Sequence, residues 1–284
     1  MKSLMRFGTS LGLIGTAVVG VMVIGSSRAH ALPDSQIIEK LERIPVFTIT
    51  NQQGAPLVAS PQQGERGAPV AGVFISQQDA QAFLTRLGSN NPELVRGVQV
   101  VPISLGDVYK MSRQQGNPQD RLEFAYIPTQ QQVDVAKQLL RQQGVTPPDN
   151  FQGVPLFIAK GGRDNGYLTI QQGNEQIIPV FFEKQGLQNL IDRFKQQQPN
   201  EAVNVTIEVI NLEGMIQTLQ QSNDQQLNKL VLIPSRDALT SIQTYLQNQA
   251  RANGGNQAQP QRPNAPAVSP QTPAPANRGN SPQR

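Results

Sequence analysis

The chain has 284 residues, of which 24 are basic and 20 acidic, giving a formal net charge of +4, and it contains no cysteine and one histidine, His30. The lack of cysteine excludes disulfides, thiol nucleophiles and thiolate metal sites. Because His30 falls inside a predicted export signal, the processed chain also lacks the imidazole that Ser-His-Asp or Cys-His systems and ordinary zinc, copper or haem sites use. The composition therefore favours a binding protein over an enzyme and predicts no cofactor and no metal.

Residues 1–31 have the pattern of a signal peptide. Lys2 and Arg6 precede an uncharged run over 11–25, and Ala29-His30-Ala31 supplies the small-x-small pattern that a signal peptidase reads, so we predict cleavage after Ala31. The apolar run is shorter than the roughly 20 residues of a membrane-spanning helix, and no later segment is as long. We expect an exported chain with no integral membrane span; an uncleaved anchor is the alternative.

Removal of this signal changes the charge of the protein. The segment contains three basic residues and no acidic one, so the net charge falls from +4 to +1. No basic stripe remains to follow a phosphate backbone, and we therefore predict no nucleic-acid binding.

Residues 32–43 follow the signal peptide, and their apolar Ile37, Ile38 and Leu41 predict a short amphipathic N-terminal helix.

Residues 44–247 contain the same unit twice, about 107 residues apart. Val73-Phe74-Ile75 is matched by Val180-Phe181-Phe182, and Ile127-Pro128 by Ile233-Pro234. Two copies are too few for an open solenoid. We therefore predict two halves, 44–145 and 146–247, related by a pseudo-two-fold axis and presenting two similar surfaces.

Each unit begins with a hairpin and continues with alternating strands and helices. In the first unit the predicted strands are 45–50, 57–59, 71–75 and 98–103, and a last strand ends at Ile127-Pro128. Helices follow the last three strands, with Ser76, Ser104 and Thr129 as predicted N-caps. In the second unit the corresponding strands are 154–159, 167–170, 177–182, 203–210 and one that ends at Ile233-Pro234. The predicted fold class is α/β (α+β), each half a mixed sheet with packed helices.

The C-terminal stretch 248–284 is rich in Pro, Gln, Asn and Ala. It has too little apolar surface to offset the entropy of ordering, so we predict a disordered tail. Pro270 and Pro273 have the spacing of a proline-rich ligand, which leaves partner binding by the tail as an alternative.

Two candidate sites have simpler explanations in the sequence. The glycine-rich segment 161–166 is followed by a predicted strand, whereas a phosphate loop requires a helix there, so we interpret it as a hairpin turn. Paired carboxylates, as in glycoside hydrolysis, are the one catalytic apparatus that the composition allows. The acidic candidates are scattered over strand ends and helix faces: Glu123, Asp134, Glu175, Glu183, Asp192 and Glu208.

The second helix of each unit has an apolar stripe that contains methionine. Methionine suits surfaces that adapt to varied apolar partners, and the stripe occurs in both units. We predict a partner-binding surface there, with core packing as the alternative. The stripe residues are Leu105, Val108, Tyr109, Met111, Leu212, Met215, Ile216 and Leu219.

The order of hydrophobic blocks resembles one known family. The signal peptide, the opening Ile44-Pro45-Val46-Phe47, the segment Val101-Pro102-Ile103-Ser104 and the restart Val154-Pro155-Leu156-Phe157 are similar to the cyanobacterial branch of the family of the twenty-two-kilodalton component of the translocon at the inner chloroplast envelope. The resemblance covers about residues 35–248 and includes no catalytic motif.

This resemblance implies a chaperone-like binder in the space between two envelope membranes, with apolar pockets on two related halves. The implied partners are POTRA domains of outer-membrane β-barrel assembly proteins and unfolded precursor proteins. Because the export signal is of the bacterial type, we expect the periplasm, and the thylakoid lumen stays open. The alternative from another class is a periplasmic protein that uses carboxylates on glycans or small molecules.

Overall fold

The computed structural model describes residues 32–60, 67–113, 122–149, 151–162, 165–197, 204–222 and 224–254. The predicted signal peptide over 1–31 therefore lies outside the described residues, as does the predicted tail beyond 254. The described part of the chain falls into a compact region that ends at Thr244, which contains both units of the repeat, and a C-terminal region that begins at Tyr245.

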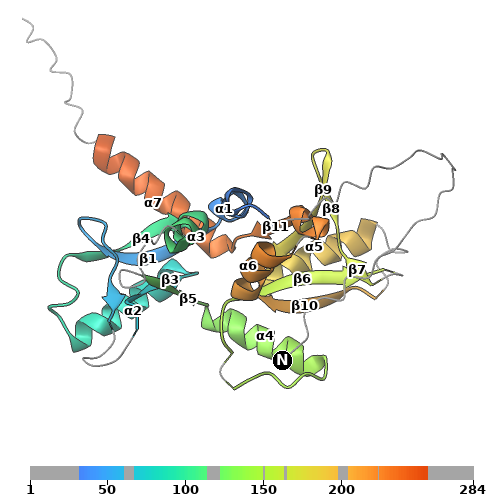
Figure 1. Ribbon diagram of the computed structural model, residues 1–284, viewed down its shortest axis with the longest axis horizontal. Coiled ribbons are helices and arrows are strands. Elements are labelled where there is room, and N and C mark those ends of the chain that lie inside the picture. Colours follow the sequence, from blue (N-terminus) through green and yellow to red (C-terminus); the bar gives the residue numbers. More distant parts are fainter. Residues whose placement is uncertain are drawn as a thin grey trace, which may run out of the picture. The chain divides into compact units, whose positions relative to one another are not determined.

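The first unit of the repeat forms one five-stranded mixed sheet (Figure 1). Its strands run in the order β2-β3-β1-β4, with β5 parallel to β3 and the other pairs antiparallel. The strands are β1 (Pro45–Asn51), β2 (Val58–Ala59), β3 (Val70–Phe74), β4 (Val98–Ser104) and β5 (Glu123–Ile127). The helices from the N-terminal segment to the end of the first unit are α1 (Asp34–Glu42), α2 (Gln77–Asn90), α3 (Leu105–Arg113) and α4 (Gln130–Gln142).

The second unit repeats this topology in a six-stranded sheet. The order is β10-β6-β9-β11, with β11 parallel to β9, β7 on β6 and β8 on β9. The strands are β6 (Pro155–Gly161), β7 (Gly166–Tyr167), β8 (Ile170–Gln172), β9 (Glu175–Phe181), β10 (Thr206–Asn211) and β11 (Leu230–Ile233). The helices are α5 (Lys184–Gln197), α6 (Leu212–Gln221), the 3-10 helix Gln225–Lys229 and α7 (Arg236–Gly254). The mixed α/β fold class is thus confirmed.

The last helix of each unit packs on the sheet of the other unit. Ala136 of α4 is fully buried against Phe157 and Leu187 of the second unit, and α4 lies beside β6 and β10 (Figure 1). In return, Ala238 of α7 is buried against Phe47 and Phe74 of the first sheet. From the sequence we predicted each of these helices in its own half. The boundary at 145 therefore separates the two copies of the repeat, but helices from each copy pack on the sheet of the other.

Hydrogen bonds fix α4 to the second unit. The N–H of Lys184 donates to Gln132 Oε1 at 3.2 Å, and Gln143 Nε2 donates to the carbonyl of Ile207 at 2.6 Å. The first bond occupies one of the N–H groups at the start of α5 that have no acceptor within the helix. Helix α4 of the first unit therefore supplies both a hydrogen-bond acceptor at the start of α5 and part of an apolar cluster of the second unit.

The largest apolar cluster includes residues from both units and from α1. Ile37 and Leu41 of α1 pack with Leu105 of α3 and Leu212 of α6, and all four are completely buried. The approach of α1 to α3 is close at Gly106, where a Cβ would lie 2.9 Å from Glu42 Cα. A larger side chain at this position would push the two helices apart, so glycine is required here by packing.

The C-terminal boundary differs from the prediction. Helix α7 continues to Gly254, whereas a tail without structure was expected from residue 248. The added turns include Ala250, Arg251 and Ala252, which are residue types that extend a helix readily. The low apolar content of this stretch hid its helical propensity.

Candidate functional site

The predicted apolar stripe lies mostly in the interior. Seven of its eight residues are buried, and Met111, at 38% exposure, is the exception. The buried residues are Leu105, Val108, Tyr109, Leu212, Met215, Ile216 and Leu219. They belong to the same apolar cluster as α1, which covers them. Core packing, the alternative left open by the sequence, therefore accounts for these seven, and a partner-binding surface made from the whole stripe is not present in this structure.

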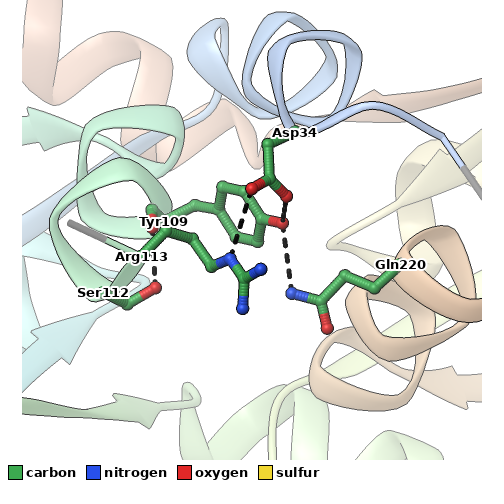
Figure 2. A network of polar contacts seen from close by, with 5 residues as sticks. All are labelled: Asp34, Tyr109, Ser112, Arg113 and Gln220. Carbon is green, nitrogen blue, oxygen red and sulfur yellow. Dashed lines mark hydrogen bonds and ion pairs between the residues drawn. The ribbon is translucent and has the colours of Figure 1, made fainter. Parts of the chain in front are cut away.

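A polar network lies at one end of the contact between α1, α3 and α6 (Figure 2). Tyr109 of α3 donates to Asp34 Oδ1 of α1 at 2.6 Å, and Gln220 Nε2 of α6 donates to the same phenol oxygen at 3.1 Å. Arg113 Nε lies 3.3 Å from Asp34 Oδ2, and Ser112 Oγ donates to the carbonyl of Tyr109 at 2.6 Å. Three helices from different parts of the chain thus meet at one hydroxyl group.

The network alters the acidity of both of its central groups. The hydrogen bond from Tyr109 and the charge of Arg113 outweigh partial burial and hold the pKa of Asp34 below its ordinary value. Burial and the neighbouring Asp34 carboxylate raise the pKa of Tyr109. At neutral pH the pair is therefore a phenol that donates to a carboxylate.

Met111 lines a small cavity of about 330 Å³ on the first sheet. None of the described residues around this cavity is charged, and its lining includes apolar side chains such as Val101 and Phe124. The remaining residues are Thr48, Thr50, Asn51, Gln52, Gly54, Pro56, Val73, Gln99, Pro102, Ile103, Val108 and Leu122. The cavity is at the small end of the range of about 300–1,000 Å³ for ligand sites. It suits one or two apolar side chains.

Three other cavities in the described part of the chain are lined partly by charged residues. The cavity of about 770 Å³ between α1 and β11 contains Lys40, whose Nζ donates to the carbonyls of Asn228 and Leu230 at 2.7 and 3.1 Å. Burial lowers the pKa of Lys40. Because two of its donors hold carbonyl groups beside the start of an edge strand, Lys40 has a structural role in joining α1 to β11.

The carboxylate candidates lie on different elements of the fold. Glu208 forms an ion pair with Lys160 at 2.5 Å. Glu183 lines a cavity of about 350 Å³ together with Asp79 and Asp237, two residues in the first turns of α2 and α7. Burial and the charge of Asp237 raise the pKa of Asp79. Acidic residues in first helical turns are accounted for by the helix dipole. Asp134 and Asp192 accept hydrogen bonds from Gln130 and Gln188 on their own helices.

The described residues also include no cluster of metal-ligating side chains. No group of three or more His, Cys, Asp or Glu side chains in that part of the chain is placed to hold a metal ion. The glycine-rich segment lies between β6 and β7, as a hairpin connection does, although residues 163–164 are outside the described part. The site that the geometry does support is the uncharged apolar cavity beside Met111.

Comparisons with known proteins give the family. The Tic22-like family model matches residues 1–244. The chain belongs to the Tic22-like family. It is 25% identical to Protein TIC 22, chloroplastic, from Pisum sativum over 78% of this chain and 81% of the pea protein. It is 26% identical to Protein TIC 22-like, chloroplastic, from Arabidopsis thaliana, over 80% of this chain and 69% of that protein.

Solved Tic22 structures have the same fold. Tic22 from Anabaena, a protein transport component, is 35% identical and superposes with a TM-score of 0.66 over 75% of this chain and 97% of its own. Tic22 from Plasmodium falciparum, at 21% identity, gives a TM-score of 0.55 over 78% of this chain and 99% of its own. The Anabaena relative is consistent with the cyanobacterial branch that the sequence suggested.

Membership in the Tic22-like family agrees with the architecture described above. The family is one of protein transport components. Within the described residues, no helix combines the length and apolarity needed to cross a membrane.

Proposed function

We propose that the protein is a chaperone-like binding protein of the periplasm that holds unfolded precursors on their way to the outer membrane. The proposal combines the protein transport family with the export signal of the sequence. It assigns no catalytic step to the chain. The thylakoid lumen is reached by similar signals and is the second compartment to test.

The observation that carries this proposal is the uncharged cavity beside Met111. An unfolded precursor differs from a folded protein in exposing apolar side chains, and burial of such side chains is favourable by about 25 cal/mol per Å². A cavity lined by apolar side chains such as Val101 and Phe124 together with Thr, Asn and Gln can bury an apolar side chain and also offer hydrogen-bonding groups to a peptide backbone. Met111 gives the site a flexible wall.

Suppression of aggregation tests the holding activity. The mature protein, without ATP, is expected to keep an unfolded outer-membrane β-barrel protein from aggregating after dilution from urea, as measured by light scattering. Met111→Asp should lose most of this activity, because it places a charge in the apolar cavity. The matched control is Leu94→Asp, a change at a side chain that is 54% exposed and lines none of the four cavities.

The outcome that contradicts the proposal is equally direct. If Met111→Asp and Leu94→Asp suppress aggregation to the same degree as the unchanged chain, the cavity is not the holding site. If the unchanged chain itself does not suppress aggregation, the holding function is wrong. Circular dichroism of each variant establishes that both remain folded.

We further propose that the protein delivers its clients to POTRA domains of a β-barrel assembly protein. Delivery requires contact with both client and acceptor, and the chain offers several separate cavities on its described surface. A pull-down from envelope extract with the mature protein should retain the assembly protein. Binding of the purified POTRA domains in a calorimeter then separates a direct contact from one bridged by a client.

A further inference from the structure

The duplication lets each residue of the apolar cavity be compared with its counterpart in the second unit. The strand registers define these counterparts. Thr48 of β1 pairs with Val101 of β4, and Ile158 of β6 pairs with Glu208 of β10. Ile158 is therefore the counterpart of Thr48, and Glu208 is the counterpart of Val101. In the same registers, Thr50 corresponds to Lys160. The hairpins add a third position, since the backbone bridge from Thr50 to Pro56 corresponds to the pairing of Lys160 with Tyr167.

Charged and bulky side chains occupy the second-unit positions. Lys160 Nζ forms an ion pair with Glu208 Oε2 at 2.5 Å and lies 4.7 Å from the centre of the Tyr167 ring. Tyr167 also packs against the central apolar cluster. The positions that form an uncharged cavity in the first unit are thus filled by a lysine, a glutamate and a tyrosine that contact one another in the second.

The electrostatics of this group favour the closed arrangement. The carboxylate of Glu208 raises the pKa of Lys160 in spite of the opposing effect of burial, so the lysine stays charged. Burial and the same carboxylate raise the pKa of Tyr167, which stays a neutral phenol beneath the ammonium group. An ion pair with a cation–π contact resists the entry of an apolar group, because entry would separate charges that are partly withdrawn from water.

From this comparison, we infer that the two units have diverged in function, and that the chain holds apolar side chains of an unfolded client at one site, in the first unit, while the Lys160–Glu208 pair closes the second. The occupant is an uncharged apolar side chain, because the described lining of the open cavity has no charged residue with which an anion or cation would pair. The inference rests on the proposed holding function. It adds the number of client-binding sites per chain, one, and the residues that determine this number.

Exchange of the two sets of residues tests the inference. The probe is N-phenyl-1-naphthylamine, an uncharged dye whose emission rises in apolar surroundings. The unchanged mature chain is expected to bind one equivalent. The double variant Thr50→Lys/Val101→Glu should bind none, and Lys160→Thr/Glu208→Val should bind two. If the first variant still binds one equivalent, or the second gains none, the inference is overturned.

Two single substitutions that introduce no charge test the same inference if the double variants fail to fold. Since the chain has no cysteine, Met111→Cys and its counterpart Thr218→Cys can each be labelled with acrylodan. Addition of an unfolded outer-membrane protein should shift the emission to the blue at 111 and leave it unchanged at 218. Equal shifts at both positions would overturn the inference while leaving the holding function standing, whereas no client binding at all would remove the holding function itself.

A second copy of the chain is the other candidate occupant, and sedimentation equilibrium detects it. The unchanged chain is expected to remain monomeric with Met111 accessible to the dye. A dimer that Met111→Asp dissociates would mean that the cavity is a contact between copies, and it would overturn the assignment to clients.

Discussion

Ser76 Oγ, at the start of α2, donates a hydrogen bond to Asp237 Oδ2, in the first turn of α7, at 3.2 Å. The two residues are 161 positions apart and belong to different units of the repeat. The same Ser76 oxygen accepts from the N–H of Asp79, which makes it the N-cap of α2. One hydroxyl group therefore joins the start of a helix of the first unit to the helix that the second unit contributes.

The exchange of α4 and α7 predicts that each sheet depends on a helix from the other unit. Ala238→Asp should lower the free energy of unfolding by about 2–4 kcal/mol, because it buries an unpaired charge against Phe47 and Phe74. The neighbouring change Leu239→Asp is the control, since that side chain is 45% exposed. Urea unfolding followed by circular dichroism measures both; equal stability of the two variants would mean that α7 does not hold the first sheet.

The close approach of α1 to α3 predicts a second stability effect. Gly106→Ala should destabilise the protein by about 1–3 kcal/mol, the usual cost of overpacking, because its Cβ would meet backbone atoms of Glu42 and Ile38 at 2.9 Å. Gly166→Ala is the matched control, since no heavy atom lies within 4 Å of a Cβ there. A loss of stability at 166 equal to that at 106 would show that the close approach of α1 to α3 does not decide the result.

The sequence predicted the repeat and most element types because those depend on local patterns. Strands such as β3 and β9 are short runs of buried apolar residues, and Ser76 has the side chain that a helix start requires. These signals are complete within a few residues of the chain. They are also the signals that the family resemblance used.

The sequence did not predict where the helices pack. The apolar face of α4 shows that the helix covers something, but nothing in its pattern says which sheet. The same limit applies to the stripe on α3 and α6, because periodicity marks an apolar face and does not reveal that α1 covers it. The alanines that make the exchanged contacts, Ala136 and Ala238, carry little hydrophobic signal of their own.

The candidate site was predicted only in part. Val108 and Met111 were named from the sequence and both line the apolar cavity. Its other walls come from strands, including Val101 and Phe124, which the sequence assigned only to the sheet. Their contribution depends on the strand register, and register follows from long-range pairing. The aligned repeat carried one usable signal, since Val101 is matched by the charged Glu208 about 107 positions later.

The network around Asp34 predicts a pH dependence at the acidic end. Its folded pKa is lower than the ordinary 3.8, so the stabilisation it provides is complete above that value and is lost as the pH falls through the folded pKa. Asp34→Asn should therefore be less stable than the unchanged chain at pH 7, by less than about 1 kcal/mol because the group is largely exposed. The difference should vanish near pH 2. Thermal unfolding at both pH values measures it, and a difference that grows on acidification would contradict the network.

Tyr126 predicts a dependence at the alkaline end. Burial, with smaller contributions from Glu213 and Tyr109, raises its pKa from 10.0 to about 12. An unfolded chain then releases the phenolic proton at lower pH than the folded one, so stability falls as the pH rises from about 10 to 12. Tyr126→Phe removes this loss, and the gap between the variant and the unchanged chain should change by up to about 2 kcal/mol over that range. Urea unfolding at pH 8, 10 and 11 measures the gap with pH 8 as the reference. A gap that stays constant over this range would show that Tyr126 ionises as easily in the folded chain as in the unfolded one, and that β5 does not hold its phenol away from water.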